Sequence, residues 1–197
     1  MDLNGDGAAD LAGMVGGTLR VFLNRPDLAG MATGSLDALP ELALPADAIG
    51  GQMAFGEFRG KGQPELMISM QPTAGKTKLY AVGLGTDRRT LAIAETLANT
   101  LVNAAALSVA DFNQDGLQDV VLIDKNASLM SVTSWRMPTP AQPVTRAYHV
   151  GHAPAAVASG LLDADSYPDL AFAIQLGPST PVVGLSVVYA LPPGGLP

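Results

Sequence analysis

A nine-residue acidic pattern occurs twice in this chain. Residues 2–10 read DLNGDGAAD and residues 111–119 read DFNQDGLQD, so both copies follow the pattern D-x-N-x-D-G-x-x-D. Apolar residues follow each copy at once. The carboxylates crowded into so short a loop repel one another unless positive charge lies among them. The pattern therefore indicates both a repeated fold and a repeated ligand.

Two further copies are recognisable by their spacing. Residues 57–65 keep the closing acidic residue as Glu65, and residues 161–169 have Leu161 in place of the first aspartate. The later copy retains the other acidic positions as Asp163, Asp165 and Asp169. The copies start at 2, 57, 111 and 161, so they lie 55, 54 and 50 residues apart. A near-constant period of this kind is the signature of a repeat architecture.

Short apolar segments flank the loops and have the composition of β-strands. Small apolar residues precede each of the later loops, and aliphatic runs such as DVVLID at 119–124 follow them. The chain has 22 Gly and 15 Pro among 197 residues, which suits many short strands and turns. A period near 50 residues holds about four strands. We therefore expect an all-β fold, a β-propeller or partial propeller of about four repeats, each a four-stranded antiparallel blade.

One segment favours a different structure. Residues 91–106, LAIAETLANTLVNAAA, are rich in Ala and Leu and place apolar residues at helical spacing. The repeat assigns the same residues to an outer strand, a turn and an inner strand. We expect the repeat to prevail, because tertiary context overrides intrinsic propensity.

The acidic loops have the residue types that Ca²⁺ requires. Ca²⁺ takes about 6–8 oxygen ligands, and alternate side chains of a tight loop can converge on one point. Gly7 and Gly116 stand where such a loop turns sharply, and we expect them to need positive φ. The loops are not EF-hands, because position twelve is Gly13 or Leu122 instead of glutamate and an aliphatic run follows. The predicted metal-binding residues are Asp2, Asn4, Asp6, Ala8 (carbonyl) and Asp10; Asp111, Asn113, Asp115, Leu117 (carbonyl) and Asp119; and Asp163, Asp165 and Asp169.

The alternative is that these loops are β-turns whose Asx side chains hydrogen bond to their own backbone. For the second copy we expect this alternative, because Arg59 and Lys61 occupy ligand positions and supply positive charge themselves. One of them should face Glu57 or Glu65. For the fourth copy both interpretations stay open, since Leu161 removes the first carboxylate.

Composition excludes several classes of protein. Hydrophobic residues make up 48% and charged residues 15%, which is typical of a globular chain and not of a disordered one. The net charge of −7 argues against a nucleic-acid partner, because phosphate binding needs a basic face. The absence of cysteine excludes disulfides and thiolate metal sites. No apolar run approaches the ~18 residues of a membrane-spanning helix.

The quoted loops resemble those of the FG-GAP/VCBS repeat family, the calcium-loop β-propellers that include the integrin α-subunit head. Phe55-Gly56, directly before the second loop, is similar to the "FG" element of that family. The resemblance implies that each loop joins the innermost strand of a blade to its neighbour, so that Asp119 closes the loop and opens the next strand. It covers nearly the whole chain, and it is close in the first and third repeats and degenerate in the second and fourth.

The resemblance also implies a domain organisation. Family members usually close about seven blades, whereas residues 1–191 would form a single segment of about four repeats, and 192–197 read as a Pro/Gly linker. We therefore expect a part of a larger propeller whose partners include further blades or domains of the same full-length chain, or a chain that pairs with other copies.

The expected function is that of a calcium-binding, non-enzymatic scaffold of an extracellular, cell-surface or periplasmic protein. Its propeller face would bind a protein or carbohydrate ligand, since binding residues concentrate on loops carried by rigid sheets. The N-terminus lacks the features of a signal peptide, so an export signal would lie outside this chain. The alternative is the propeller domain of a secreted hydrolase or lyase acting on polysaccharides. The sequence shows no G-x-S-x-G motif and no cysteine nucleophile, and we predict no catalytic residue.

Overall fold

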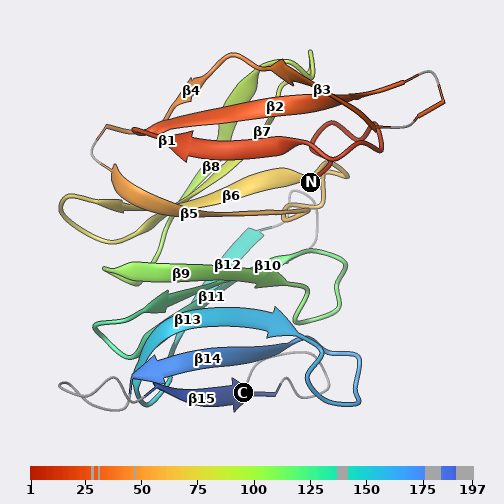
Figure 1. The fold of residues 1–197 in the computed structure, drawn as a ribbon. Coiled ribbons are helices and arrows are strands. Elements are labelled where there is room, and N and C mark those ends of the chain that lie inside the picture. Colours follow the sequence, from red (N-terminus) through yellow and green to blue (C-terminus); the bar gives the residue numbers. More distant parts are fainter. Residues whose placement is uncertain (28, 31, 47, 137–141, 176–182, 190–197) are drawn as a thin grey trace.

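The computed structural model describes residues 1–27, 29–30, 32–46, 48–136, 142–175 and 183–189. Within these residues the fold is all-β, and fifteen strands form four antiparallel sheets stacked one above another (Figure 1). The all-β prediction is confirmed. Across the same residues there is no helix of the length and apolar character needed to span a membrane.

The four sheets follow one another along the chain. The first contains β1 (Leu11–Val15), β2 (Thr18–Pro26), β3 (Ala32–Ala38) and β4 (Leu42–Ala43). The second contains β5 (Ala48–Gly56), β6 (Glu65–Pro72), β7 (Lys78–Leu84) and β8 (Leu91–Ala98). The third contains β9 (Ala104–Ala110), β10 (Asp119–Asp124), β11 (Leu129–Arg136) and β12 (Gln142–His149). The fourth contains β13 (Ala153–Gly160), β14 (Asp169–Gln175) and β15 (Val183–Val188).

Each acidic loop occupies the same place in this order. In the last three sheets it joins the first strand to the second, so that β10 begins at Asp119 and β14 at Asp169, as expected. The first loop leads directly into β1, which pairs with β2. The second and third sheets have four strands in simple antiparallel order. The first differs, because β3 and the two-residue β4 share the same side of β2.

Apolar side chains fill the space between consecutive sheets. Three clusters of buried residues lie between the first and second, the second and third, and the third and fourth sheets. Strand β10 contributes to two of them, since Val120 and Leu122 point to one face and Val121 and Ile123 to the other. A strand covered on both faces reads as an unbroken apolar run, which explains the aliphatic segment after the third loop.

Residues 91–106 form strand β8, a turn and the start of β9, so the helical alternative is wrong. The turn between the strands is held by tertiary contacts. The Asp124 carboxylate accepts hydrogen bonds from the amides of Val102 (3.3 Å) and Asn103 (3.0 Å). Leu101 is buried among side chains of the second and third sheets. Sheet pairing and this burial outweigh the helix propensity of the Ala/Leu run.

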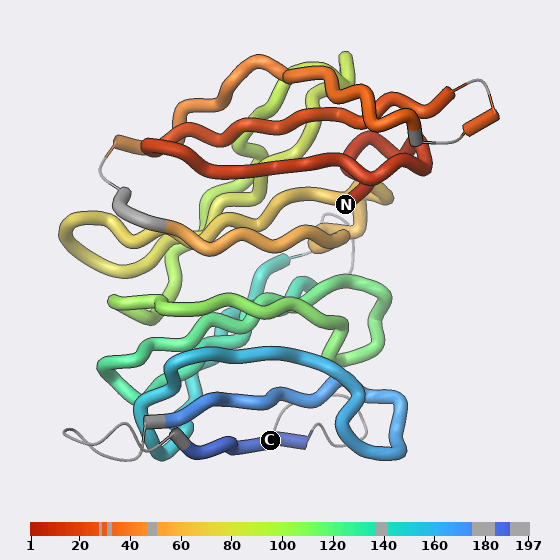
Figure 2. Tube along the Cα trace, in the orientation of Figure 1, coloured from red at the N-terminus to blue at the C-terminus, as the bar shows by residue number. Residues whose placement is uncertain are grey.

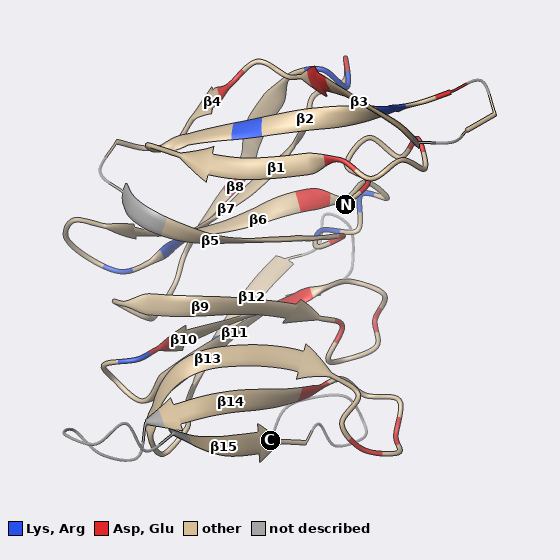
Figure 3. Ribbon diagram, viewed as in Figure 1, with Lys and Arg blue, Asp and Glu red and all other residues tan. Residues whose placement is uncertain are grey.

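The chain passes through the stack in sequence order (Figure 2). The acidic loops lie along one edge of the stack, as the acidic residues in Figure 3 show. Neighbouring loops are bonded to each other: the Gln118 amide donates to the Glu57 carbonyl at 2.7 Å, and Gln114 Nε2 donates to the Ser166 carbonyl at 2.9 Å. The predicted linker at 192–197 lies outside the described residues.

Candidate metal loops

The third loop, residues 111–119, is organised around the side chain of Asp111. Its two carboxylate oxygens accept hydrogen bonds from the backbone amides of Asp115 (3.1 Å) and Gly116 (2.8 Å). Asn113 and Asp115 each accept the amide two residues along the chain, at 2.9 Å in both cases. These are Asx turns, and they wind the loop about its polar side chains.

The first loop, residues 2–10, has the same arrangement. Asp2 accepts the amides of Asp6 (3.1 Å) and Gly7 (2.9 Å), as the first aspartate of the third loop does. The side-chain oxygens of Asn4 and Asp6 again accept the amides two residues further on, at 3.0 and 2.9 Å. The two loops therefore share one hydrogen-bond pattern although they belong to different sheets.

The backbone of the first three loops turns through the left-handed region at the same two positions. The residues are Gly5 (72°), Gly60 (66°) and Gln114 (56°) at the fourth position, and Gly7 (86°), Gly62 (66°) and Gly116 (86°) at the sixth. Positive φ at Gly7 and Gly116 confirms the prediction for both, and glycine adopts it without a Cβ penalty. The second loop keeps this backbone shape although its side chains differ.

An apolar residue at the second position anchors each of these three loops in the core. Leu3 is 3% exposed, Phe58 0% and Phe112 2%. The side chains of Ala8 and Leu117, proposed above only for their carbonyls, are buried as well. The acidic pattern alone did not predict this anchoring role. The signal for it was the apolar residue that separates the first and third polar positions of each loop.

The ninth-position carboxylate ties the end of the loop to its beginning. Asp10 Oδ2 accepts the amide of Leu3 at 2.7 Å, and Asp119 Oδ2 accepts that of Phe112 at 3.1 Å. Asp10 Oδ1 also accepts the amide of Asn24 at 2.9 Å. Both oxygens of Asp10 are thus satisfied.

Asp119 lacks the second of these contacts. Its Oδ1 accepts no hydrogen bond of normal geometry from the described residues, although the side chain is buried and the residue only 1% exposed. Burial raises the pKa of this carboxyl to about 7; the Ser134 hydroxyl and the Phe112 amide oppose the rise, and the charges of Asp115 and Asp111 add to it. The third loop therefore contains a buried carboxyl whose ionised form is disfavoured by its surroundings.

In the second loop, a basic side chain neutralises the ninth-position carboxylate of the same loop. The guanidinium of Arg59 donates from Nε to Glu65 Oε2 at 2.6 Å and makes a second bond to Glu65 Oε1. Arg59 Nη1 also lies 3.7 Å from Glu95 Oε2. Both partners of the main pair are 5% exposed, and the bond to Glu65 raises the pKa of the guanidinium. The expectation that a basic residue of this loop faces Glu65 is confirmed.

The fourth loop has a different shape. Asp163 and Asp165 make the two Asx turns, at 2.9 and 2.8 Å, but there is no first carboxylate for the backbone to wrap around. Neither Ala164 nor Ser166, at the fourth and sixth positions, has a positive φ. The second-position residue, Leu162, is 49% exposed and does not anchor the loop in the core.

The structure thus brings the predicted side chains of the first and third loops together around their own amides. In the described part of the chain, no three acidic or histidine side chains gather closely enough to form a ready-made metal cluster. The donors present in the third loop are carboxylate, amide and carbonyl oxygens, which are the ligands of a hard cation such as Ca²⁺. Asp119 Oδ1 adds a carboxylate oxygen that accepts no hydrogen bond of normal geometry, so the types of donor in this loop are those that a divalent ion takes as ligands.

No protein-family model matches the chain, and no characterised protein sequence matches it.

Proposed function

We propose that this chain is a calcium-binding, non-enzymatic scaffold, a segment of a β-propeller of the FG-GAP/VCBS type in an extracellular, cell-surface or periplasmic protein. The observation that carries the proposal is the shared geometry of the first and third loops. Two loops in different sheets have the same acidic residues, the same left-handed turns and the same hydrogen-bond pattern. Repetition of that detail indicates a common ligand.

The arrangement of the sheets supports the propeller part of the proposal. The first strands of the last three sheets lie side by side, β5 against β9 and β9 against β13. Consecutive sheets pack face to face through apolar clusters. Sheets that face one another and meet along their first strands are the arrangement of neighbouring propeller blades.

The residues that would hold Ca²⁺ are the polar side chains of each loop and one backbone carbonyl. When bound, the ion would supply the positive charge that the buried Asp119 lacks. In the second loop Arg59 supplies this charge, so we propose no ion there. The proposed ligands are Asp2, Asn4, Asp6, Ala8 (carbonyl) and Asp10 in the first loop, and Asp111, Asn113, Asp115, Leu117 (carbonyl) and Asp119 in the third. In the fourth loop, Asp163, Asp165 and Asp169 would be the ligands of any ion bound there.

The loop edge would face the ligand of the scaffold, because loops carried by rigid sheets are where binding residues concentrate. Isothermal titration of the calcium-free protein with CaCl₂ tests the calcium proposal directly. We expect Asp111→Ala and Asp2→Ala each to lower the number of ions bound per chain, and the double variant to lose the ions of both loops. Calcium binding that is the same in the double variant and the unmodified chain would overturn the assignment to these loops.

A further inference from the structure

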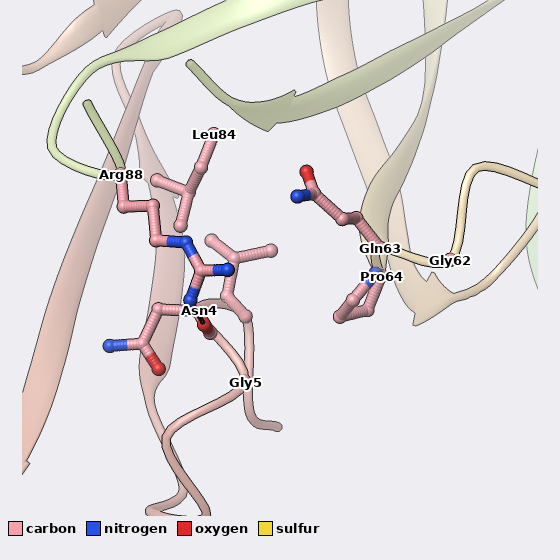
Figure 4. A pocket seen from close by; sticks show the side chains of 8 residues that line it. Asn4, Gly5, Gly62, Gln63, Pro64, Leu84 and Arg88 are labelled. Carbon is pink, nitrogen blue, oxygen red and sulfur yellow. Dashed lines mark hydrogen bonds between the residues drawn. The ribbon is translucent and has the colours of Figure 1, made fainter. Parts of the chain in front are cut away.

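A groove with positively charged residues along its rim lies between the first loop and the second sheet. It consists of two adjoining hollows of about 220 and 150 Å³. Figure 4 shows the guanidinium of Arg88 beside Asn4, facing Gln63 and Pro64 across the larger hollow. Both hollows have Leu3, Gln63, Pro64 and Leu84 in their walls, so they form one continuous surface.

Arg88 is held in a conformation that its residue type disfavours. It lies in the turn between β7 and β8 with φ of 52°, where Gly or Asn would be relaxed. Strained residues of this kind cluster at functional sites. From this turn the side chain reaches the first loop, where Nη1 donates to the Asn4 carbonyl at 2.8 Å.

Most of the hydrogen-bonding capacity of Arg88 remains free for a ligand. A guanidinium has five N–H donors, and the Asn4 carbonyl accepts from one nitrogen. No ion pair joins Arg88 to any residue that the structure describes, and the same holds for Lys61 on the wall of the smaller hollow. Arg59, in contrast, forms ion pairs with Glu65 and Glu95. Arg88 and Lys61 are therefore two cations without an ion-pair partner among the described residues, whereas Glu65, which also lines the smaller hollow, is paired with Arg59.

The size and walls of the groove limit what it can hold. Each hollow is smaller than the ~300–1,000 Å³ that encloses a whole small ligand, so the groove suits one side chain or one group of a larger molecule. Leu3, Leu84 and Pro64 provide an apolar floor for methylene groups. The described lining residues include no aromatic ring on which a sugar ring could stack.

We propose that this groove binds an acidic side chain of a partner protein, with its carboxylate at Arg88 in the larger hollow and its stem on Leu84 and Pro64. Lys61, on the smaller hollow, adds a longer-range attraction. Arginine pairs with carboxylate through two parallel N–H donors, which gives such a contact direction as well as charge. The proposal names a partner class for the binding role proposed above. It needs no ion in the loops, so the calcium titration and the peptide titration below can fail independently.

The test is a titration of the ¹⁵N-labelled chain, in calcium, with a short peptide that contains two glutamates flanked by leucines. The matched ligand replaces both glutamates by glutamine. We expect amide shifts centred on Asn4, Gln63 and Arg88 with the glutamate peptide and none of comparable size with the glutamine peptide. Equal responses to both peptides would overturn the proposal. Tighter binding of an oligogalacturonate to the same amides would assign the groove to an acidic polysaccharide and overturn the peptide assignment.

Two variants test the residues. Arg88→Asn removes the guanidinium and introduces a residue type that tolerates positive φ. We expect it to lower the affinity for the glutamate peptide by about tenfold or more. Lys61→Gln should weaken it by a smaller factor, because Lys61 is an exposed point charge. The control is Lys125→Gln in the exposed hairpin between β10 and β11, which removes an equal charge away from the groove and should leave the affinity unchanged. Unchanged affinity in both groove variants would refute the assignment.

Discussion

The guanidinium of Arg59 and the carboxylate of Glu65 form a two-bond ion pair inside the second loop. Glu65 is the ninth residue of this loop, the position where the first and third loops have an aspartate. Both residues are buried. The second loop has the same left-handed turns as the acidic loops, at Gly60 and Gly62. The second loop therefore has a basic side chain at its third position, where the first and third loops have asparagine, and this side chain neutralises its own ninth-position carboxylate.

Removing one partner of this pair should destabilise the fold strongly. Glu65→Ala leaves the guanidinium of Arg59 buried without its main counter-charge, so we expect a loss of about 3–5 kcal/mol in the free energy of unfolding. Urea denaturation in chelator measures it. The control is Arg20→Ala, which breaks an exposed 2.8 Å pair with Glu41 and should cost no more than about 1 kcal/mol. Equal losses in the two variants would contradict a role for the buried pair.

The third and second loops should respond differently to calcium. Asp115→Ala removes a proposed ligand, so the increase in melting temperature that calcium gives should shrink. Lys61→Ala, in the second loop, should leave the calcium response unchanged. An ion that binds only the folded state stabilises it by ~2.7 kcal/mol at a hundredfold excess over Kd. Melting curves in calcium and in chelator measure the effect, and identical curves for the unmodified folded chain would refute calcium binding.

Asp119 should make the stability of the calcium-free protein depend on pH. Its pKa of about 7 in the folded state lies above the ordinary value of 3.8, so the folded state binds the proton more tightly than the unfolded state. Its contribution is therefore favourable below the ordinary pKa and is lost as the pH rises toward 7, by up to a few kcal/mol. Asp119→Asn should flatten this part of the profile. Denaturation in chelator from pH 4 to pH 8 measures it, and a slope that persists in Asp119→Asn would assign the effect elsewhere.

The sequence predicted the features that repeat. Strand β10 and its loop were recognisable because the acidic pattern and the aliphatic run recur, and the same period decided that Leu91–Ala98 is a strand against its helix propensity. A contact that occurs only once in the chain leaves no recurring pattern, so the period could not predict it. Arg88 and Asn4 are 84 residues apart, and nothing in the sequence signals that the β7–β8 turn reaches the first loop.

The burial of Asp119 shows the same limit within a predicted site. Asp10 and Asp119 occupy the same position in the loop pattern, but both oxygens of Asp10 accept backbone amides, whereas Asp119 Oδ1 accepts no hydrogen bond of normal geometry from the described residues. The difference depends on the neighbouring strand, where the Asn24 amide reaches Asp10. Hydrogen bonds across a sheet depend on register and local geometry, which the loop pattern does not encode.

The fourth loop offers a gain-of-function prediction. It lacks a first-position carboxylate, and its sixth-position residue, Ser166, does not adopt the positive φ found in the other loops. Leu161→Asp restores the carboxylate at a residue that is 62% exposed, so the substitution removes nothing from the core. Ser166→Gly frees the turn and keeps the carbonyl that accepts from Gln114, although it loses the hydroxyl contact.

We expect the double variant Leu161→Asp with Ser166→Gly to bind one more Ca²⁺ per chain than the parent in an isothermal titration. The first carboxylate would again give the loop amides a centre, and Asp163, Asp165 and Asp169 already stand at the other acidic positions. The matched control is Leu162→Asp with Ser166→Gly. Leu162 is 49% exposed and adjacent, so this variant adds the same charge one position out of register. If both double variants gain an ion, charge alone is responsible; if neither does, the loop geometry proposed for the first and third repeats is not what binds calcium.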